Sequence, residues 1–415
     1  MWILAAGFIL SVFFVPASIA VRPDYILPVL MCVIGYVKFG DRLVKLAIKE
    51  ARLILWLAFF AIISIAGQYF AGSGLSSRDF MVVVRYVVYL ATIYAGLTVA
   101  LSMRSSGLLR LLSLLLVFAL IAISFAQYFN IGGINSFLVP FYSEEGRYAT
   151  LEAGMSWRRI IGTMGNPNYW GFLLGLGFTY AGYMCLQKHY MHIALVIPLF
   201  IALIMTGSRT SLVATMVAML VGFFLMANTG KKASLKSMMP ILAGVAFFGL
   251  IYFVFSLFLA NFYESENRFA STNLGTLELR IQWWFEIFRK MFDQPHTFII
   301  GQGPAKLESV RFGDNMYIRY LRDFGIIGLS LYMMLLFNIF KKLYRLSRLL
   351  KQKSSIFLVV VFLGFVQLAV FDLAADGWFN VRIAELLLFA YGLAVGSAYK
   401  NIWRKSKDES IHNNT

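Results

Sequence analysis

Long unbroken runs of apolar residues constrain this chain more than any other feature of its sequence. A helix needs about 20 apolar residues to cross the hydrocarbon core of a bilayer. Twelve runs are candidates for such helices: residues 2–21, 25–38, 53–71, 80–102, 108–129, 166–187, 192–207, 210–228, 238–261, 323–340, 356–373 and 381–399. Their apolar positions are continuous rather than alternating, which is typical of helices and not of membrane β-strands. The sequence therefore predicts an all-α, polytopic transmembrane helical bundle of about 12 spans, with residues 1–415 forming one integral membrane domain.

The overall composition supports the same conclusion. Hydrophobic residues make up 60% of the chain and charged residues only 14%, whereas an ordinary soluble domain has about a quarter of its residues charged. A water-soluble globule cannot hide that much apolar surface. A cytosolic enzyme, a secreted domain and a disordered tail are therefore excluded. Cys32 and Cys185 lie inside apolar runs, where they form neither a disulfide framework nor a metal site.

Two of the apolar runs leave alternatives open. The run at 25–38 is short and contains Pro28, so it is tilted, broken or re-entrant. The first run ends in Ser18-Ile19-Ala20, which resembles a signal-peptidase site, but no basic segment precedes it. We therefore expect an uncleaved helix there.

The charges predict the orientation in the membrane. With the amino terminus inside, the inner connections hold 21 of the 37 lysines and arginines and four of the 20 acids. The entire net charge of +17 then lies on one side, as the positive-inside rule requires. The excess of basic residues thus indicates the orientation of the chain in the membrane, and we expect no nucleic-acid partner. Both termini are expected to be cytoplasmic, with 400–415 as a cytoplasmic tail.

The two sides also differ in the type of cation. Lysine dominates the inner side, whereas Lys290 and Lys306 are the only outer lysines and the other outer cations are arginines. Arginine suits a bidentate grip on carboxylate or phosphate. The alternative is that individual outer arginines simply pair with outer acids.

Two outer connections, 130–165 and 262–322, are long enough to form a cap on the outer face. In the second, apolar residues recur at helical spacing from Thr276, a candidate N-cap, to Phe292. This pattern predicts an amphipathic helix. It lies either along the membrane–water boundary or packed against the bundle.

Ionisable residues at membrane depth are functional candidates, because each is costly without a partner. Arg85 lies inside the fourth run and Arg209 in a tight hairpin between two runs. Arg382 and Glu385, near the outer start of the last run, are spaced to form a helix-face i,i+3 pair. Such charges lie in the outer half rather than near the midplane, which weighs against an ion-coupled transporter. The chain has no nucleotide-binding loop, zinc motif or dinucleotide fingerprint, so we expect no cofactor and no metal.

Several short motifs resemble those of the O-antigen polymerase/ligase superfamily. In chain order they are Gly162-Thr163-Met164-Gly165-Asn166-Pro167-Asn168, Thr206-Gly207-Ser208-Arg209, Arg280 followed by Trp283 or Trp284, Gly301-Gln302-Gly303, Asp314-Asn315 and Gly325-Ile326-Ile327-Gly328. The resemblance covers roughly residues 160–340. Each motif is weak by itself, and their order and their place in the topology carry the resemblance. Many relatives have histidine where this chain has Asp314, which makes a typical ligase less favoured.

The resemblance implies a metal-independent, GT-C-like glycosyltransferase of a bacterial inner membrane, active on the periplasmic face. Its substrate would be an oligosaccharide on undecaprenyl pyrophosphate, with a chain-length regulator and a flippase as candidate partners. Arg209 and Arg280 would hold the donor pyrophosphate, and Asp314 would be the base. The alternative is that Asp314 or Asn315 only caps the following helix. The further substrate-binding candidates are Asn315, Arg158, Arg159, Arg319, Arg85, Asn166 and Asn168.

The resemblance favours a polymerase of repeat units for O-antigen, capsule or exopolysaccharide. One alternative is an O-antigen ligase that transfers the glycan to lipid A–core. An alternative of another class is a glycolipid transporter or flippase, and a third is a receptor or scaffold without chemistry.

Overall fold

The computed structural model describes residues 1–16, 22–70, 76–103, 107–142, 158–187, 189–227, 275–293, 295–304, 315–350 and 352–412. Within these ranges every regular element is a helix, which confirms the all-α prediction. The chain divides into two compact units, a first unit of residues 1–114 with 284–415 and a second unit of residues 115–283. The helices α5 (Gly107–Phe129) and α12 (Gly275–Asp293) each cross a boundary between the units. The prediction of one integral membrane domain stays a prediction.

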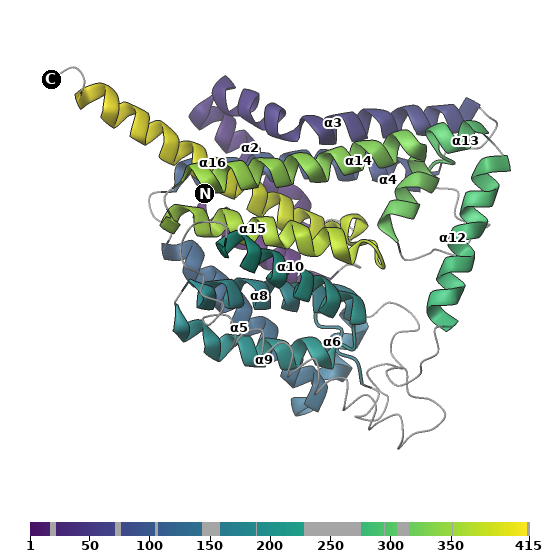
Figure 1. Cartoon of the computed structure of the whole chain (residues 1–415), viewed down its shortest axis with the longest axis horizontal. Coiled ribbons are helices and arrows are strands. Elements are labelled where there is room, and N and C mark those ends of the chain that lie inside the picture. The colour runs from purple at the N-terminus through teal and green to yellow at the C-terminus, as the bar shows by residue number, and fades with distance from the viewer. Residues whose placement is uncertain are drawn as a thin grey trace. The chain divides into compact units, whose positions relative to one another are not determined.

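The first unit contains most of the long helices (Figure 1). The described helices that lie entirely in this unit are α1 (Trp2–Phe14), α2 (Pro23–Phe39), α3 (Asp41–Phe70), α4 (Ser77–Ser102), α13 (Pro295–Ile300), α14 (Met316–Leu349), α15 (Gln352–Phe371) and α16 (Val381–His412), with the 3-10 turn η3 (Gly377–Phe379) before α16. The helix α2 continues through Pro28, so the broken arrangement predicted as one alternative for 25–38 is not formed. The segment 400–415, predicted as a tail, continues α16 as far as His412.

Glycines allow α4 and α16 to approach closely. A Cβ atom added to Gly96 of α4 would lie 2.3 Å from the carbonyl oxygen of Phe389, and one added to Gly392 of α16 would lie 2.3 Å from the carbonyl oxygen of Ile93. Gly392 and Gly396 form a Gly-x-x-x-Gly sequence. Small residues at this spacing pair helices in lipid, where apolar burial gives little drive for association. The contact therefore supports a helix pair inside a membrane.

The helices α3 and α14 run side by side in opposite directions (Figure 1). Near one end, Glu50 Oε1 of α3 lies 2.8 Å from Lys342 Nζ of α14. Near the other end, Ser64 Oγ donates to the carbonyl oxygen of Asp323 at 3.3 Å. The first of these ends carries the lysines that predict the inner side of the membrane, and the second is the predicted outer side.

The glycines of two predicted motifs interlock at the end of the first unit that is predicted to lie on the outer side. Gly301 and Gly303 both have φ +83°, and Gly303 donates its N–H to the carbonyl oxygen of Asp323 at 3.0 Å. A Cβ atom on Gly301 would lie 2.3 Å from that same oxygen. Gly325, with φ +64°, kinks α14, and a Cβ atom there would lie 2.3 Å from the carbonyl oxygen of Ile299. Only glycine fits such positive φ angles at so close an approach.

The second unit contains the remaining described helices. They are α6 (Ile134–Tyr142), α8 (Pro167–Leu186), α9 (Ile193–Met205) and α10 (Arg209–Ala227), with the 3-10 turns η1 (Ile131–Gly133) and η2 (Tyr190–His192). The helix α8 packs against both α9 and α10. The predicted runs at 166–187, 192–207 and 210–228 thus match three helices to within two residues at each end.

The amphipathic helix predicted from Thr276 to Phe292 is present as α12. It begins at Gly275, so Thr276 lies inside the helix and its prediction as the N-cap is wrong. Within the first unit, Ile287 and Met291 of α12 are buried against Leu321 of α14. The carboxyl-terminal half of this helix therefore packs against another helix, which is the second of the two predicted alternatives.

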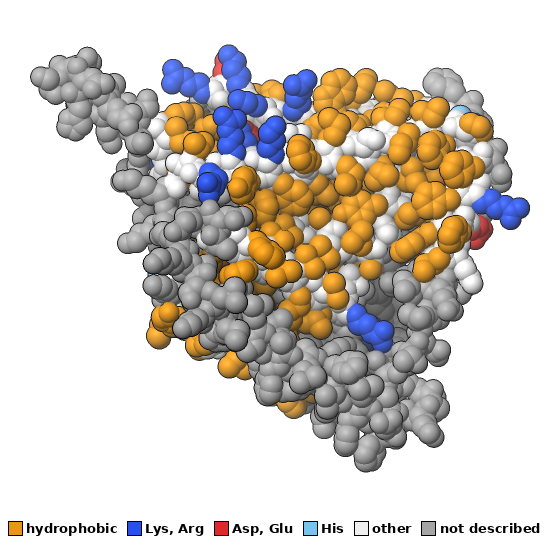
Figure 2. Space-filling view, viewed as in Figure 1, with side chains coloured by type: hydrophobic (Ala, Val, Ile, Leu, Met, Phe, Trp, Pro, Cys, Tyr) orange, Lys and Arg blue, Asp and Glu red, His pale blue; other side chains and the backbone are white. Residues whose placement is uncertain are grey.

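The described part of the chain has five helical segments that are long and apolar enough to cross a membrane: Asp79–Ser102, Leu111–Phe129, Arg209–Met226, Met316–Leu349 and Val381–Trp403. Large apolar side chains such as Phe59 of α3 and Phe337 of α14 are more than half exposed. Figure 2 shows a broad apolar surface on one face, with most of the visible lysines and arginines gathered at one edge. These features are those of a membrane protein. The predicted number of about 12 spans stays a prediction, and the run at 238–261 lies outside the described residues.

Candidate functional site

Two guanidinium groups of the first unit lie on one aromatic ring. The Cζ atom of Arg85 lies 4.7 Å from the centroid of the Phe379 ring, and the Cζ atom of Arg319 lies 4.1 Å from it. Arg85 comes from α4, Arg319 from the first turn of α14 and Phe379 from η3. The electron-rich face of the ring attracts each cation. The structure thus brings together two predicted site residues that are far apart in the sequence.

Carboxylates hold one of these two arginines. Arg319 Nη1 donates to Asp376 Oδ2 at 2.6 Å, and Arg319 Nε lies 3.6 Å from Asp323 Oδ2. Asp323 is fully buried and also accepts from Arg322, whose Nε lies 2.7 Å from Oδ1. Arg319 is therefore paired with acids, as the alternative for the predicted outer arginines expects. Its assignment to a substrate phosphate stays a prediction.

Arg85 differs from Arg319 in its surroundings. It forms no ion pair with any residue that the structure describes, and its Nε atom is buried without a hydrogen-bonding partner there. A guanidinium at this depth in an apolar helix is costly when unpaired. Arg85 is therefore the predicted arginine whose environment most needs an anion.

Buried tyrosines support the ring that carries the arginines. Tyr320 stacks on Tyr332 with a centroid distance of 4.4 Å and an interplanar angle of 10°, and its hydroxyl lies 3.1 Å from that of Tyr86. Tyr332 donates to Asp372 Oδ2 at 2.5 Å. Asp372 directly follows α15 and is fully buried, and its Oδ1 atom also accepts from the backbone N–H of Trp378 at 3.3 Å. The Phe379 ring thus packs against a cluster of buried tyrosine side chains.

Asn315 caps α14. Its Oδ1 atom accepts from the backbone N–H groups of Tyr317 at 2.9 Å and Ile318 at 3.1 Å, and its Nδ2 atom donates to the carbonyl oxygen of Leu373 at 2.8 Å. Asn315 is therefore a helix cap, as the capping alternative predicts. Asp314, the predicted base, lies outside the described residues.

In the second unit, the motif at 162–168 forms a tight turn into α8. Gly162 has φ +55°, and a Cβ atom there would lie 1.9 Å from the Trp170 ring. Asn166 is the N-cap of α8, and its side chain accepts from the backbone N–H of Asn168 at 2.9 Å. Gln127 accepts from the backbone N–H of Gly162 at 2.8 Å. The motif is therefore held rigidly at the start of the helix.

This turn contacts the hairpin that contains Arg209. Arg159 Nε donates to the carbonyl oxygen of Thr206 at 2.9 Å, and its Nη2 atom lies 3.4 Å from Asn168 Oδ1. Ser211 Oγ donates to the carbonyl oxygen of Asn168 at 2.8 Å. Arg209 itself is exposed at the start of α10. The structure thus brings Arg159, Asn168 and the Arg209 hairpin together within this unit.

Two further predicted site arginines, Arg158 and Arg280, lie on different segments of the chain. Arg158 Nη1 donates to the carbonyl oxygen of Tyr128 at 2.5 Å in the second unit. Arg280 lies on α12, and its side chain is outside what the structure describes. Their predicted contacts with a pyrophosphate stay predictions.

The pair predicted between Arg382 and Glu385 is not formed. Arg382 donates to the carbonyl oxygen of Val15, and neither carboxylate oxygen of Glu385 has a hydrogen-bonding partner among the described residues. Helical spacing allows such a pair, but the carbonyl of a neighbouring helix end competes for the guanidinium. In the same described ranges, no group of three or more His, Cys, Asp or Glu side chains is placed to hold a metal ion.

The sequence interpretation missed the aromatic part of the first unit's site. Trp378 and Phe379 are not among the predicted site residues, although Gly377-Trp378-Phe379 stands in a short connection, predicted to be outer, directly after Asp376. Aromatic residues beside charges at a predicted membrane boundary were the available signal. No protein-family model and no curated protein sequence matches this chain.

Proposed function

We propose that this chain is a membrane glycosyltransferase of the O-antigen polymerase/ligase type, which polymerises repeat units carried on undecaprenyl pyrophosphate. The observation that carries the proposal is the unpaired guanidinium of Arg85 on the Phe379 ring. A lipid-linked pyrophosphate would supply the missing anion and has its prenyl chain in the same bilayer. The proposal includes a GT-C-like fold of about 12 spans, in a bacterial inner membrane with both termini cytoplasmic.

The reaction is a group transfer at the sugar that is attached to the pyrophosphate. An acceptor hydroxyl oxygen of the next lipid-linked unit attacks the anomeric carbon and forms the new glycosidic bond. The bond from that carbon to the pyrophosphate oxygen breaks, and the electron pair leaves with undecaprenyl pyrophosphate. A base takes the hydroxyl proton, and Asp314 is the proposed base. The role proposed for Arg85 is to stabilise the negative charge that grows on the leaving group.

For the second unit, taken by itself, Arg159 and Arg209 are proposed as contacts for the lipid-linked substrate. Arg159 is oriented by Thr206 and Asn168, so its guanidinium is held in place before a substrate arrives. Arg209 is exposed at a helix start, where a helix dipole favours an anion. Arg280 is proposed for the same role on the strength of its motif.

Purified protein in nanodiscs, supplied with undecaprenyl-pyrophosphate-linked repeat units, tests the proposal. We expect a ladder of polymer lengths from the parent chain and loss of the ladder in Arg85→Gln. Arg85→Lys should also be impaired, because the planar guanidinium is lost. Arg345→Gln, which removes an exposed cation at the lysine-rich end of α14, is the matched control and should keep the ladder.

Two results would contradict the proposal. One is a parental ladder from Arg85→Gln, or from both Arg209→Ala and Arg280→Ala. The other is transbilayer movement of intact lipid-linked units without any new glycosidic bond, which would favour the flippase alternative. Glycan profiling of a deletion strain separates polymerase from ligase, since single-repeat caps indicate a lost polymerase and polymer left on the carrier indicates a lost ligase.

A further inference from the structure

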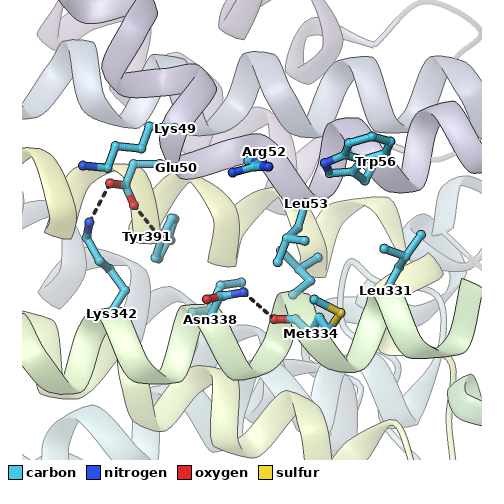
Figure 3. A pocket seen from close by; sticks show the side chains of 12 residues that line it. Lys49, Glu50, Arg52, Leu53, Trp56, Leu331, Met334, Asn338, Lys342 and Tyr391 are labelled. Carbon is cyan, nitrogen blue, oxygen red and sulfur yellow. Dashed lines mark hydrogen bonds and ion pairs between the residues drawn. The ribbon is translucent and has the colours of Figure 1, made fainter.

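A cavity of about 510 Å³ lies in the first unit between α3 and α14, at the end of these helices opposite to Arg319. Figure 3 shows side chains of α3 and α14 pointing into it from both sides, with Tyr391 of α16 behind them. Its volume is in the range of sites that hold a small organic ligand. None of the residues that line it belongs to the site proposed above.

One end of the cavity is polar, and its only acid is already neutralised. Among the described lining residues Glu50 is the single carboxylate. Its Oε1 atom lies 2.8 Å from Lys342 Nζ, and its Oε2 atom accepts from the Tyr391 hydroxyl at 2.9 Å. The Tyr399 hydroxyl donates to Oε1 at 3.3 Å. The charge of Lys342 is therefore balanced by Glu50, and the pair lines the polar end of the cavity without a net charge.

Two cations of the cavity are left without a counter-charge. Lys49 and Arg52 of α3 are exposed, and neither forms an ion pair with a residue that the structure describes. They line the same polar end as the neutralised pair (Figure 3). This end of the cavity therefore has a net charge of two positive units and calls for an anion.

The rest of the cavity is apolar and open along its length. Trp56 of α3 is 47% exposed and Met334 of α14 is 51% exposed, and both line it together with Leu331. From Arg52 to Trp56 is about one helical turn, so cations and apolar residues follow each other along the helix axis. The cavity is thus a groove whose polar and apolar ends are separated along the axis of α3.

We propose that this groove binds one anionic phospholipid. Its phosphate lies on Lys49 and Arg52, and one acyl chain follows the wall made by Trp56, Leu331 and Met334. The charge of the groove requires an anion, and its apolar length requires a chain on that anion, so a single molecule with both properties satisfies it. The lysine-rich ends of α3 and α14 are the predicted inner side, where basic pockets between helices bind acidic headgroups.

Native mass spectrometry and thermal unfolding of delipidated protein in a neutral detergent test the proposal. Phosphatidylglycerol is the probe, phosphatidylcholine is the zwitterionic control and inorganic phosphate is the control for a free anion. We expect one tightly held phosphatidylglycerol and a raised melting temperature with that lipid alone. The double variant Lys49→Gln/Arg52→Gln should bind it roughly 30-fold more weakly, which corresponds to about a fivefold loss for each cation.

Two further variants make the test independent of folding and of total charge. Lys341→Gln/Arg345→Gln removes two exposed cations from the same end of α14 outside the groove, and it should bind the lipid as the parent does. Met334→Trp keeps every charge but fills the apolar part, and it should lose the lipid while unfolding at the parental temperature without lipid. Equal loss in the control double variant, equal binding of phosphatidylcholine, or equal stabilisation by inorganic phosphate would each overturn the proposal.

Discussion

The substitution Gly325→Ala tests whether the interlocked glycines hold the predicted outer end of the first unit together. Gly325 has φ +64° and ψ −168°, a region that is almost restricted to glycine and costs other residues about 1–3 kcal/mol. The added Cβ would also lie 2.3 Å from the carbonyl oxygen of Ile299 and 2.7 Å from the backbone nitrogen of Gly301. Because these are backbone atoms, they cannot move aside as the end of a flexible side chain can.

The structure provides a matched control for the backbone strain. Gly40 has φ +58° and ψ −151°, in the same region, but no atom lies within 4 Å of a Cβ placed there. Gly40→Ala therefore carries the strain without the clash. Overpacking costs about 1–3 kcal/mol. The hydrogen bonds from Gln302 N–H to the Arg322 carbonyl and from Gly303 N–H to the Asp323 carbonyl, which the shift would weaken, contribute about 1 kcal/mol each.

We therefore expect Gly325→Ala to destabilise the protein by about 3–5 kcal/mol more than Gly40→Ala does. For a domain of 150–250 residues, 1 kcal/mol shifts the melting temperature by roughly 2–4 °C. The measurement is the thermal unfolding midpoint of each purified variant in the same detergent. Equal midpoints for the two variants would refute the reasoning, because they would mean that the close approach of the two backbones is unimportant.

Three other variants test separate features of the structure. Glu50→Ala leaves Lys342 without its counter-charge and should lower stability by about 1–3 kcal/mol, whereas Glu50→Gln keeps an acceptor and should lose less; detergent melting curves of the two compare them. Asn315→Ala removes the cap of α14 and should cost about 0.5–2 kcal/mol, with Asn315→Asp as the variant that keeps the cap; faster hydrogen exchange in the first turn of α14 is the expected signature. Gly162→Ala places a methyl group inside the Trp170 ring, so a shift in tryptophan fluorescence relative to the parent should accompany its loss of stability.

The helices themselves could be predicted from the sequence because their signal is local. The apolar runs at 166–187 and 381–399 correspond to α8 and to the first part of α16. The glycines at 301, 303 and 325 were selected as motifs, and the structure gives the physical reason for them in positive φ angles and close backbone approach. The Gly-x-x-x-Gly sequence at 392–396 was equally visible and would have predicted a close helix pair.

The candidate site was less predictable, since it depends on which segments meet. Arg85 is a candidate for its charge and depth and Arg319 is one of the further substrate-binding candidates, but their common contact with Phe379 needs three segments to converge. Asn315 was proposed to orient a substrate, and its cap became clear only when the hydrogen bonds to α14 were visible. The type of residue therefore identified the candidate site residues. Only the packing showed which of them are paired, which cap a helix and which lack a partner among the described residues.

By itself, the sequence determined that this chain forms apolar helices, where most of them begin and end, and which of their ends carry the lysines, because each of these properties depends on neighbouring residues. Only the tertiary structure decided that Glu50 meets Lys342 across 292 positions of sequence, and that Arg319 is neutralised while Arg85 is not. Such pairings follow from the shapes of helix surfaces that are distant in the chain, and a local pattern carries no information about them.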